Sequence, residues 1–278
     1  MKNKIIKPSY EIYPNLNCAV IVYVNDVPVF EYLGDKTIDG IYDGSVPINH
    51  ILLESGKYEV KGVMYPRHKQ NSLTENDGMS IEFNLSDIDN WKETKHSFHP
   101  ELSTPDAFFD KNGAITNVYK GLDSYIIKTT IDVTLPFKLK GWQNSINLKE
   151  LDQKRLQSEV FEAYTKIHSL LKTYNASEFI EVSKDKEKLQ SEGFYFNKEK
   201  ENEIRSKINQ VFNKKLEVKP LDFSKLKLNI FGYGKLVNLL NPDGSSPIVF
   251  FDPIEPEIKV EFDIKLHKKS LRDNLTII

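Results

Sequence analysis

The chain has 278 residues, of which 39% are hydrophobic and 28% are charged. This composition is typical of a globular chain and excludes an intrinsically disordered one, and the length suits one large domain or two moderate ones. The formal net charge of -2 excludes a strongly basic overall field, so we expect no nucleic-acid partner.

The cysteine content and the N-terminus narrow the class further. Cys18 is the single cysteine, which excludes an intramolecular disulfide and a thiolate-rich metal site. It lies in the apolar run 18–24, so we expect a buried, unreactive thiol. The basic N-terminus lacks the apolar stretch of a signal peptide, and no window approaches the roughly 18 apolar residues of a membrane span. As written, the sequence predicts a cytoplasmic protein without a transmembrane segment, or a periplasmic one if a native leader was removed.

The first half of the chain alternates short apolar runs with turn residues. Asn25-Asp26 is an expected turn, and Pro28, which cannot donate a ladder hydrogen bond, marks the following strand as an edge strand. We predict strands at residues 16–24, 27–32, 46–53, 57–65, 79–85 and 125–137. Several short strands separated by turns predict an antiparallel β-sandwich for residues 1–140.

The segment 86–117 is polar and contains Pro100 and Pro105. We predict a long loop there, of the kind that is often functional or mobile. The motif His96-Ser-Phe-His99 could hold a metal if it lay on a helix, but Pro100 follows directly and exposed histidines are the expected reading.

Acidic residues open the same segment. Asp87, Asp89 and Glu93 could form a carboxylate pair for acid–base chemistry. The run from Ser86 to Trp91 is more typical of the capped start of a short helix with solvated acids, and this is the structure that we expect.

The pattern changes to helical beyond residue 140. Apolar residues recur at steps of three and four from Leu148 to Tyr174, with Asn147 as an approximate capping residue. We predict shorter helices near residues 178–190 and at 198–212, the latter capped by Asn197.

The C-terminal part returns to strands. Five apolar residues alternate with four charged residues from Ile258 to Leu266, which predicts a strand with one buried and one solvated face. The order of strands, helices and strands predicts an α+β fold, with an N-terminal antiparallel β-sandwich (1–140) followed by helices on a curved antiparallel sheet (141–278).

The motif Gly232-Tyr233-Gly234-Lys235 suggests phosphate binding at first sight. A P-loop needs a longer spacing before its glycine-lysine pair, a hydroxyl after the lysine and a following helix. Here Leu236 stands at the hydroxyl position and a strand-like run follows. We therefore interpret the glycines as a bend in an outgoing strand. We expect residues 241–244 to form a turn, so that residues 236–240 and 247–251 pair as a hairpin.

Two halves of the chain resemble known architectures. The run Val24-Asn-Asp-Val-Pro-Val and the motif Val46-Pro-Ile-Asn49, followed by Glu54-Ser-Gly56, resemble jelly-roll accessory modules over residues 10–85. That resemblance implies a β-sandwich that either binds carbohydrate or is purely structural. The C-terminal half is similar in architecture to NTF2-like cones, and this resemblance assigns no residue a role.

No serine-hydrolase motif is present, and we predict no catalytic residue, no metal and no cofactor. The leading hypothesis is a non-enzymatic protein-binding protein of inhibitor, immunity or assembly type, with Trp142 and Tyr233 as candidate partner-binding residues because interface hot spots favour such aromatics. A small-molecule or carbohydrate binder, using either the sandwich face or a pocket between the helices and the curved sheet, is the alternative. A hydrolase with a dispersed site, in which His96 and His99 would be tested, is the second alternative.

Overall fold

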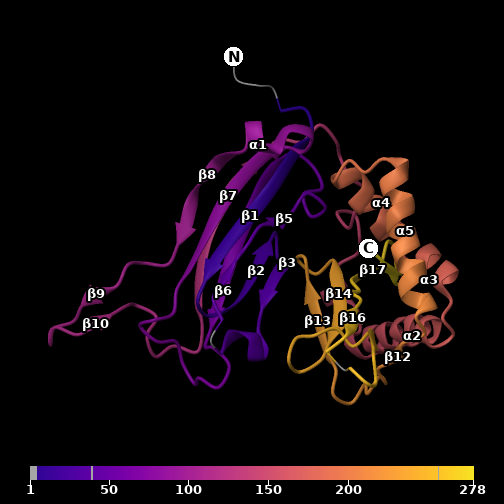
Figure 1. Ribbon diagram of the computed structural model, residues 1–278. Coiled ribbons are helices and arrows are strands. Elements are labelled where there is room, and N and C mark those ends of the chain that lie inside the picture. Colours follow the sequence, from indigo (N-terminus) through magenta and orange to yellow (C-terminus); the bar gives the residue numbers. More distant parts are fainter. Residues whose placement is uncertain (1–4, 39, 256) are drawn as a thin grey trace. The chain divides into compact units, whose positions relative to one another are not determined.

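The computed structural model describes residues 5–38, 40–255 and 257–278. The chain divides into two compact units, Met1–Lys138 and Leu139–Ile278, and each is described by itself (Figure 1). The fold is α+β: a strand-rich antiparallel unit is followed by helices and further antiparallel sheets. Within the described residues, no helix has both the length and the apolar character that membrane crossing requires.

Two antiparallel sheets form the body of the first unit. One sheet has the order β4 (Tyr42–Asp43), β1 (Pro8–Leu16), β7 (Met79–Asp87) and β8 (His96–Ser103), with β5 (Val46–Pro47) also paired to β1. The other has the order β11 (Tyr125–Val133), β6 (Gly56–Tyr65), β2 (Ala19–Val24) and β3 (Val27–Tyr32). A separate ribbon pairs β9 (Phe108–Phe109) with β10 (Ile115–Thr116), and the helical turns are η1 (Gly34–Thr37), η2 (Ile88–Asn90) and α1 (Trp91–Thr94).

The core of this unit lies between its two sheets. Ile12 and Phe83 of one sheet and Val22, Val60 and Ile131 of the other are all fully buried. Alternate residues of a strand point to opposite faces, so each sheet turns one apolar face inward. The predicted antiparallel β-sandwich is confirmed.

The turn between β2 and β3 follows from its residue types. Asn25 and Asp26 both have positive φ, of 46° and 63°, which is the backbone of a type I′ hairpin turn and suits these two residue types. Strand β3 lies at the end of its sheet, so Pro28 removes no bond from a central ladder. The predicted turn and edge strand are confirmed.

The second unit combines two small sheets with four helices among its described residues. The sheets have the orders β12 (Glu217–Val218), β15 (Val249–Phe251), β16 (Lys259–Glu261), and β13 (Lys227–Phe231), β14 (Leu236–Leu240), β17 (Leu266–His267), β18 (Thr276–Ile277). The helices are α2 (Gln153–Lys172), α3 (Ala176–Val182), α4 (Lys184–Gly193) and α5 (Lys198–Asn213), and the turn η3 (Leu148–Glu150) precedes α2.

One apolar cluster joins these helices to both sheets. It includes Leu156, Val160 and Leu171 on one face of α2, and Val237 and Phe250 on the strands. The rings of Phe179, Phe212, Phe250 and Phe262 contact one another with centroid distances of 5.0 to 6.1 Å. These aromatic contacts bring α3 and α5 against β15 and the segment after β16. Of the four rings, those of Phe179 and Phe262 line the cavity described below.

The helix boundaries depend on their capping residues. Asn197 accepts a hydrogen bond from the Lys200 amide (2.8 Å) at the start of α5, as predicted. Helix α2 begins at Gln153 instead of Leu148, because Asp152 caps it by accepting from the Arg155 amide (2.8 Å). Asn147 caps only the preceding turn η3. The predicted single helix is therefore a short turn and a separate helix.

The prediction of a loop at residues 86–117 is wrong. This segment contains η2, α1, the strand β8 and the β9–β10 ribbon. Strand β8 is largely exposed, so it lacks the apolar alternation that identifies a half-buried strand. No strand is predicted over most of β1, and of the predicted strand 46–53 only Val46–Pro47 is a strand.

The C-terminal strands are paired differently from the prediction. From Val260 to Leu266 the run alternates between more and less buried side chains, whereas Ile258 is 45% exposed, so the predicted buried face does not extend to it. The run is split into β16 and β17, which lie in different sheets. Strand β14 pairs with β13 and β17, whereas β15 pairs with β12 and β16. Residues 236–240 and 247–251 therefore do not form the predicted hairpin, because β14 and β15 lie in different sheets.

Candidate functional site

The β9–β10 ribbon carries exposed apolar side chains. Phe109 is 73% exposed and Ile115 is 56% exposed, and the two residues are direct cross-strand partners. Directly opposed side chains lie on the same face of a ribbon, so Phe109 and Ile115 form one apolar patch. Phe108 and Val118 are also exposed. Figure 1 shows the ribbon projecting away from the sheets of its unit.

The turn of this ribbon is fixed by hydrogen bonds. Asp110 accepts from the main-chain amides of Asn112 (2.8 Å) and Ala114 (3.0 Å), and Gly113 donates to the Asp110 carbonyl oxygen (2.9 Å). Gly113 has a φ of 77°. A type I turn followed by a left-handed glycine is a standard three-residue hairpin loop, so the local sequence holds the apolar patch in place.

Both legs of the ribbon are attached at their base. The Thr104 amide donates to the Met79 carbonyl oxygen of β7 (2.9 Å). On the other leg, the hydroxyl of the buried Tyr119 donates to the Asp77 carbonyl oxygen (2.6 Å), and Asn117 is buried beside it. The ribbon is thus an exposed arm on a fixed base. We call residues 105–116 the hairpin arm.

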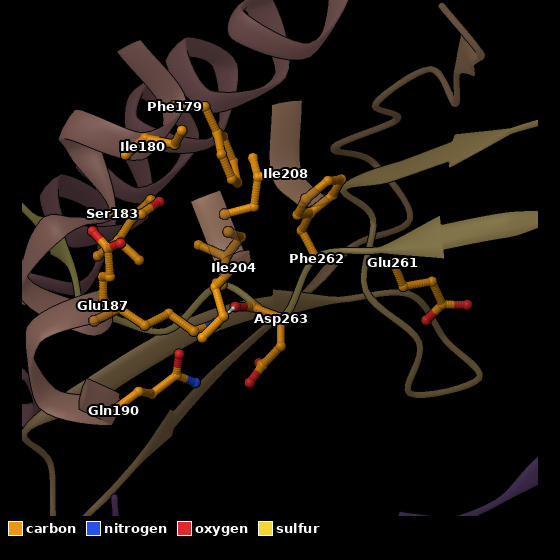
Figure 2. A pocket seen from close by; sticks show the side chains of 13 residues that line it. Phe179, Ile180, Ser183, Glu187, Gln190, Ile204, Ile208, Glu261, Phe262 and Asp263 are labelled. Atoms are coloured by element: carbon orange, nitrogen blue, oxygen red, sulfur yellow. Dashed lines mark hydrogen bonds between the residues drawn. The ribbon is translucent and has the colours of Figure 1, made fainter. Parts of the chain in front are cut away.

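The second unit contains a cavity of about 410 Å³. Helices α3, α4 and α5 form one side of it, and residues 261–264 and Ile277 form the other. Figure 2 shows apolar side chains, Ile204 and Ile208 among them, gathered in one part of the cavity, whereas Gln190 and Asp263 lie in another. Ligand pockets are commonly 300–1,000 Å³ and mostly apolar with a few polar groups, so this cavity has the size and lining of a binding site.

The charged groups on the cavity wall are held in ion pairs or hydrogen bonds. Glu187 of α4 receives two hydrogen bonds from Arg205 of α5 (2.5 and 2.9 Å). Asp263 pairs with Lys265. Lys186 donates from Nζ to the main-chain carbonyl oxygen of Asp263 (2.5 Å). Burial lowers the pKa of the Lys186 ammonium, and the negative charge of Asp263 offsets that shift only in part.

The two predicted partner-binding residues lie in different surroundings. Trp142 is 8% exposed, so its ring is available to a partner only if its surroundings move. Tyr233 is 58% exposed and has a φ of 54° in the turn between β13 and β14. Tyr233 is not one of the residues that line the cavity. A partner-binding role for either residue stays a prediction.

The motif around Tyr233 is a hairpin turn. Gly232, Tyr233 and Gly234 have φ values of 59°, 54° and 87°, and they join two directly paired strands. The Gly234 carbonyl oxygen accepts from the Leu148 amide (2.8 Å), and Lys235 donates to the Ser145 carbonyl oxygen (2.5 Å). The glycines serve a reversal of the chain, which is sharper than the predicted bend.

The histidine and carboxylate candidates are dispersed. On the strand β8, His96 contacts the Thr94 carbonyl oxygen (2.9 Å), and His99 contacts the Thr129 hydroxyl (2.9 Å). Throughout the residues that the structure describes, no three His, Cys, Asp or Glu side chains gather as a metal site. Asp87 caps η2 by accepting from the Asp89 amide (3.0 Å), as predicted.

Sequence reasoning missed one serine–histidine pair. Ser145 Oγ lies 2.8 Å from His267 Nδ1, and both residues are buried. Burial lowers the pKa of His267 to about 4. Ser145 is 4% exposed, so this hydroxyl is not presented to a substrate and the pair is a packing feature. Cys18 is fully buried, and burial raises the pKa of its thiol to about 12, as expected of an unreactive cysteine.

Comparisons with known proteins identify no homologue of this chain. No protein-family model matches the chain, and no curated protein and no solved structure matches it significantly. The resemblances to jelly-roll modules and NTF2-like cones therefore stay predictions. The hairpin arm and the cavity are the two candidate sites.

Proposed function

We propose that this chain is a non-enzymatic protein-binding protein that contacts its partner through the hairpin arm. The observation that carries the proposal is the pairing of Phe109 with Ile115 on an exposed ribbon with a fixed base. Contiguous exposed apolar side chains are uncommon on monomeric proteins and mark interaction sites. Inhibitor, immunity or assembly roles all require such a surface.

The hairpin arm has a low intrinsic stability. A two-stranded ribbon buries little of its own apolar surface and is marginal by itself. Here the turn at Asp110–Gly113 and the anchors at Thr104 and Tyr119 hold its shape. A preformed arm loses little conformational entropy on binding, which increases affinity. Aromatic residues at the centre of an interface commonly dominate its energy.

The test is an affinity capture from source-organism lysate, read by quantitative mass spectrometry. It compares the native chain with the double variant Phe109→Ser/Ile115→Ser. Trp91→Ser is the matched control, because Trp91 is an exposed aromatic of the same unit (54%) that lies off the arm. We expect one stoichiometric partner whose affinity falls by about tenfold or more in the double variant, as for hot-spot residues, and is retained in Trp91→Ser.

A photo-crosslinking residue at position 109 places the contact directly. Crosslinking to the captured partner from position 109, and not from position 91, would support the arm as the interface. Full retention of the partner by the double variant would refute the arm, and absence of any partner would refute protein binding. Unchanged thermal unfolding of the double variant shows that the loss is not due to misfolding.

A further inference from the structure

The cavity of the second unit is independent of the hairpin arm. We propose that it binds an amphiphile with one carboxylate, whose hydrocarbon chain lies among the apolar lining and whose carboxylate pairs with Lys186. The proposal goes beyond protein binding and assigns a ligand class to a site within residues 179–277.

The lining favours a hydrocarbon chain. Seven apolar side chains line the cavity, from α3, α5, the segment between β16 and β17, and β18: Phe179, Ile180, Ile204, Ile208, Phe262, Ile264 and Ile277. Figure 2 shows Phe179, Ile208 and Phe262 turned toward one another. Burial of apolar ligand surface against such a lining is favourable at about 25 cal/mol per Å². A glycan would leave its hydroxyl groups without enough partners along this part of the wall.

The charges on the wall favour one anionic group. Each carboxylate on the wall already has a cation: Glu187 pairs with Arg205 (2.5 Å), Glu261 with Lys259 (2.6 Å), and Asp263 with Lys265. Lys186 is different, because no carboxylate of the described residues lies within ion-pair distance of its Nζ. Its ammonium donates to the Asp263 main-chain carbonyl oxygen and can donate further bonds.

The energetics of Lys186 point the same way. Burial lowers its pKa, the nearby Asp263 opposes this shift, and the positive charge of Lys265 adds to it. A partly buried ammonium without a paired carboxylate is costly. A ligand carboxylate supplies that counter-charge and can form a charge-assisted hydrogen bond, which is stronger than a neutral one. A single lysine matches a monoanion better than a doubly charged phosphate.

Calorimetry with decanoate and decanol on the full chain tests the proposal. Decanol has the same hydrocarbon chain without the charge. We expect decanoate to bind with one-to-one stoichiometry and decanol to bind about tenfold more weakly, in keeping with the strength of hydrogen bonds to charged groups. Lys186→Met keeps the length of the side chain and removes the charge, so it should weaken decanoate binding by about tenfold or more and leave decanol unchanged.

Two variants serve as controls. Lys188→Met removes an exposed charge from the same helix, where Lys188 pairs with Glu192 (3.8 Å), and should leave binding unchanged. Phe109→Ser/Ile115→Ser should also bind decanoate like the native chain, which separates this proposal from the hairpin arm. Ile204→Phe narrows the apolar part of the cavity and should shift the preference from dodecanoate toward octanoate.

Three results would overturn the proposal. Absence of binding for octanoate, decanoate and dodecanoate refutes the ligand class. Equal affinity for decanoate and decanol, or native affinity in Lys186→Met, refutes the charge pairing. An unchanged chain-length preference in Ile204→Phe refutes the placement of the chain in the cavity. Far-ultraviolet circular dichroism confirms that each variant is folded.

Discussion

The phenolic oxygen of Tyr164 lies 2.9 Å from the main-chain nitrogen of Leu239 and accepts its hydrogen bond. The same hydroxyl donates to the carbonyl oxygen of Ile264 (3.1 Å). Tyr164 is 1% exposed, and burial raises its pKa. One side chain of α2 thereby satisfies main-chain groups of β14 and of the segment between β16 and β17. This contact fixes the helix against both strand regions of the second unit.

Tyr164→Phe should therefore destabilise the second unit. The change leaves the Leu239 amide and the Ile264 carbonyl without this partner in a buried place, and an unsatisfied buried group costs about 1–3 kcal/mol. Urea unfolding followed by circular dichroism measures the loss. A change below roughly 0.5 kcal/mol, the usual range of surface substitutions, would show that other groups replace the hydroxyl.

Asn49 should be equally important to the first unit. Its Oδ1 accepts from the Tyr10 amide (2.7 Å), its Nδ2 donates to the Pro8 carbonyl oxygen (2.8 Å), and it is fully buried. Asn49→Ala removes both bonds from the start of β1, so we expect a loss of about 2–3 kcal/mol. Ser45→Ala is the control, because Ser45 Oγ donates to Glu11 in an exposed place. Equal unfolding midpoints for the two variants would contradict this role.

Gly234→Ala should show that the glycine motif is structural. Its φ is 87°, and an added Cβ would lie 2.1 Å from Asn147 Oδ1, which caps η3. We expect a loss of about 2 kcal/mol or more, the sum of left-handed strain and displacement of the cap. Gly121→Ala has the same strain (φ 85°) but no atom within 4 Å of the added Cβ. If both variants lose the same stability in calorimetry, the contact with Asn147 has no energetic role.

The sequence predicts the parts of the fold that depend on local chemistry. Asn25-Asp26 and Asn197 are confirmed as turn and cap because their side chains and backbone preferences act within a few residues. The failures concern long-range pairing. Strand β8 is exposed, so no periodicity marks it. The run 258–266 is split because its two ends join different sheets, which no local pattern reveals.

The candidate sites show the same division. The run Phe108-Phe-Asp-Lys-Asn-Gly113 contains a hairpin signal, an aspartate before a glycine turn. The arm therefore has a local signal in the sequence, although the prediction for residues 86–117 is a loop. The cavity is different, because its walls come from three helices and two strand regions that are distant in sequence. Lys186 stands in a run of charged residues, so only tertiary structure distinguishes it from its exposed neighbour Lys188.

His267 should make stability depend on pH. Burial is the largest cause that lowers its pKa to about 4, Lys269 adds to the shift and Asp185 opposes it. The ordinary pKa of a histidine side chain is 6.5. Between about pH 4 and pH 6.5 the unfolded chain therefore binds more protons than the folded chain. The contribution of His267 is thus complete above about pH 6.5 and is lost as the pH falls toward about 4. From these values, the loss between about pH 7 and pH 5 is on the order of 2 kcal/mol.

The variant His267→Gln isolates this contribution from those of other groups. Burial also lowers the pKa of His168, which acts in the same direction, so the native chain alone cannot assign the effect. Glutamine can form a hydrogen bond with the Ser145 hydroxyl in place of His267 Nδ1 but does not titrate, so the pH dependence should flatten by the amount above. His68→Gln, at a partly exposed histidine that faces Asp35 (3.2 Å), is the control for the loss of an imidazole elsewhere in the chain. The test is the free energy of unfolding of all three chains, measured with urea across this pH range. If this free energy changes with pH in parallel for the native chain and His267→Gln, His267 binds protons equally in the folded and unfolded chains. Its buried position would then make no contribution to the pH dependence of stability.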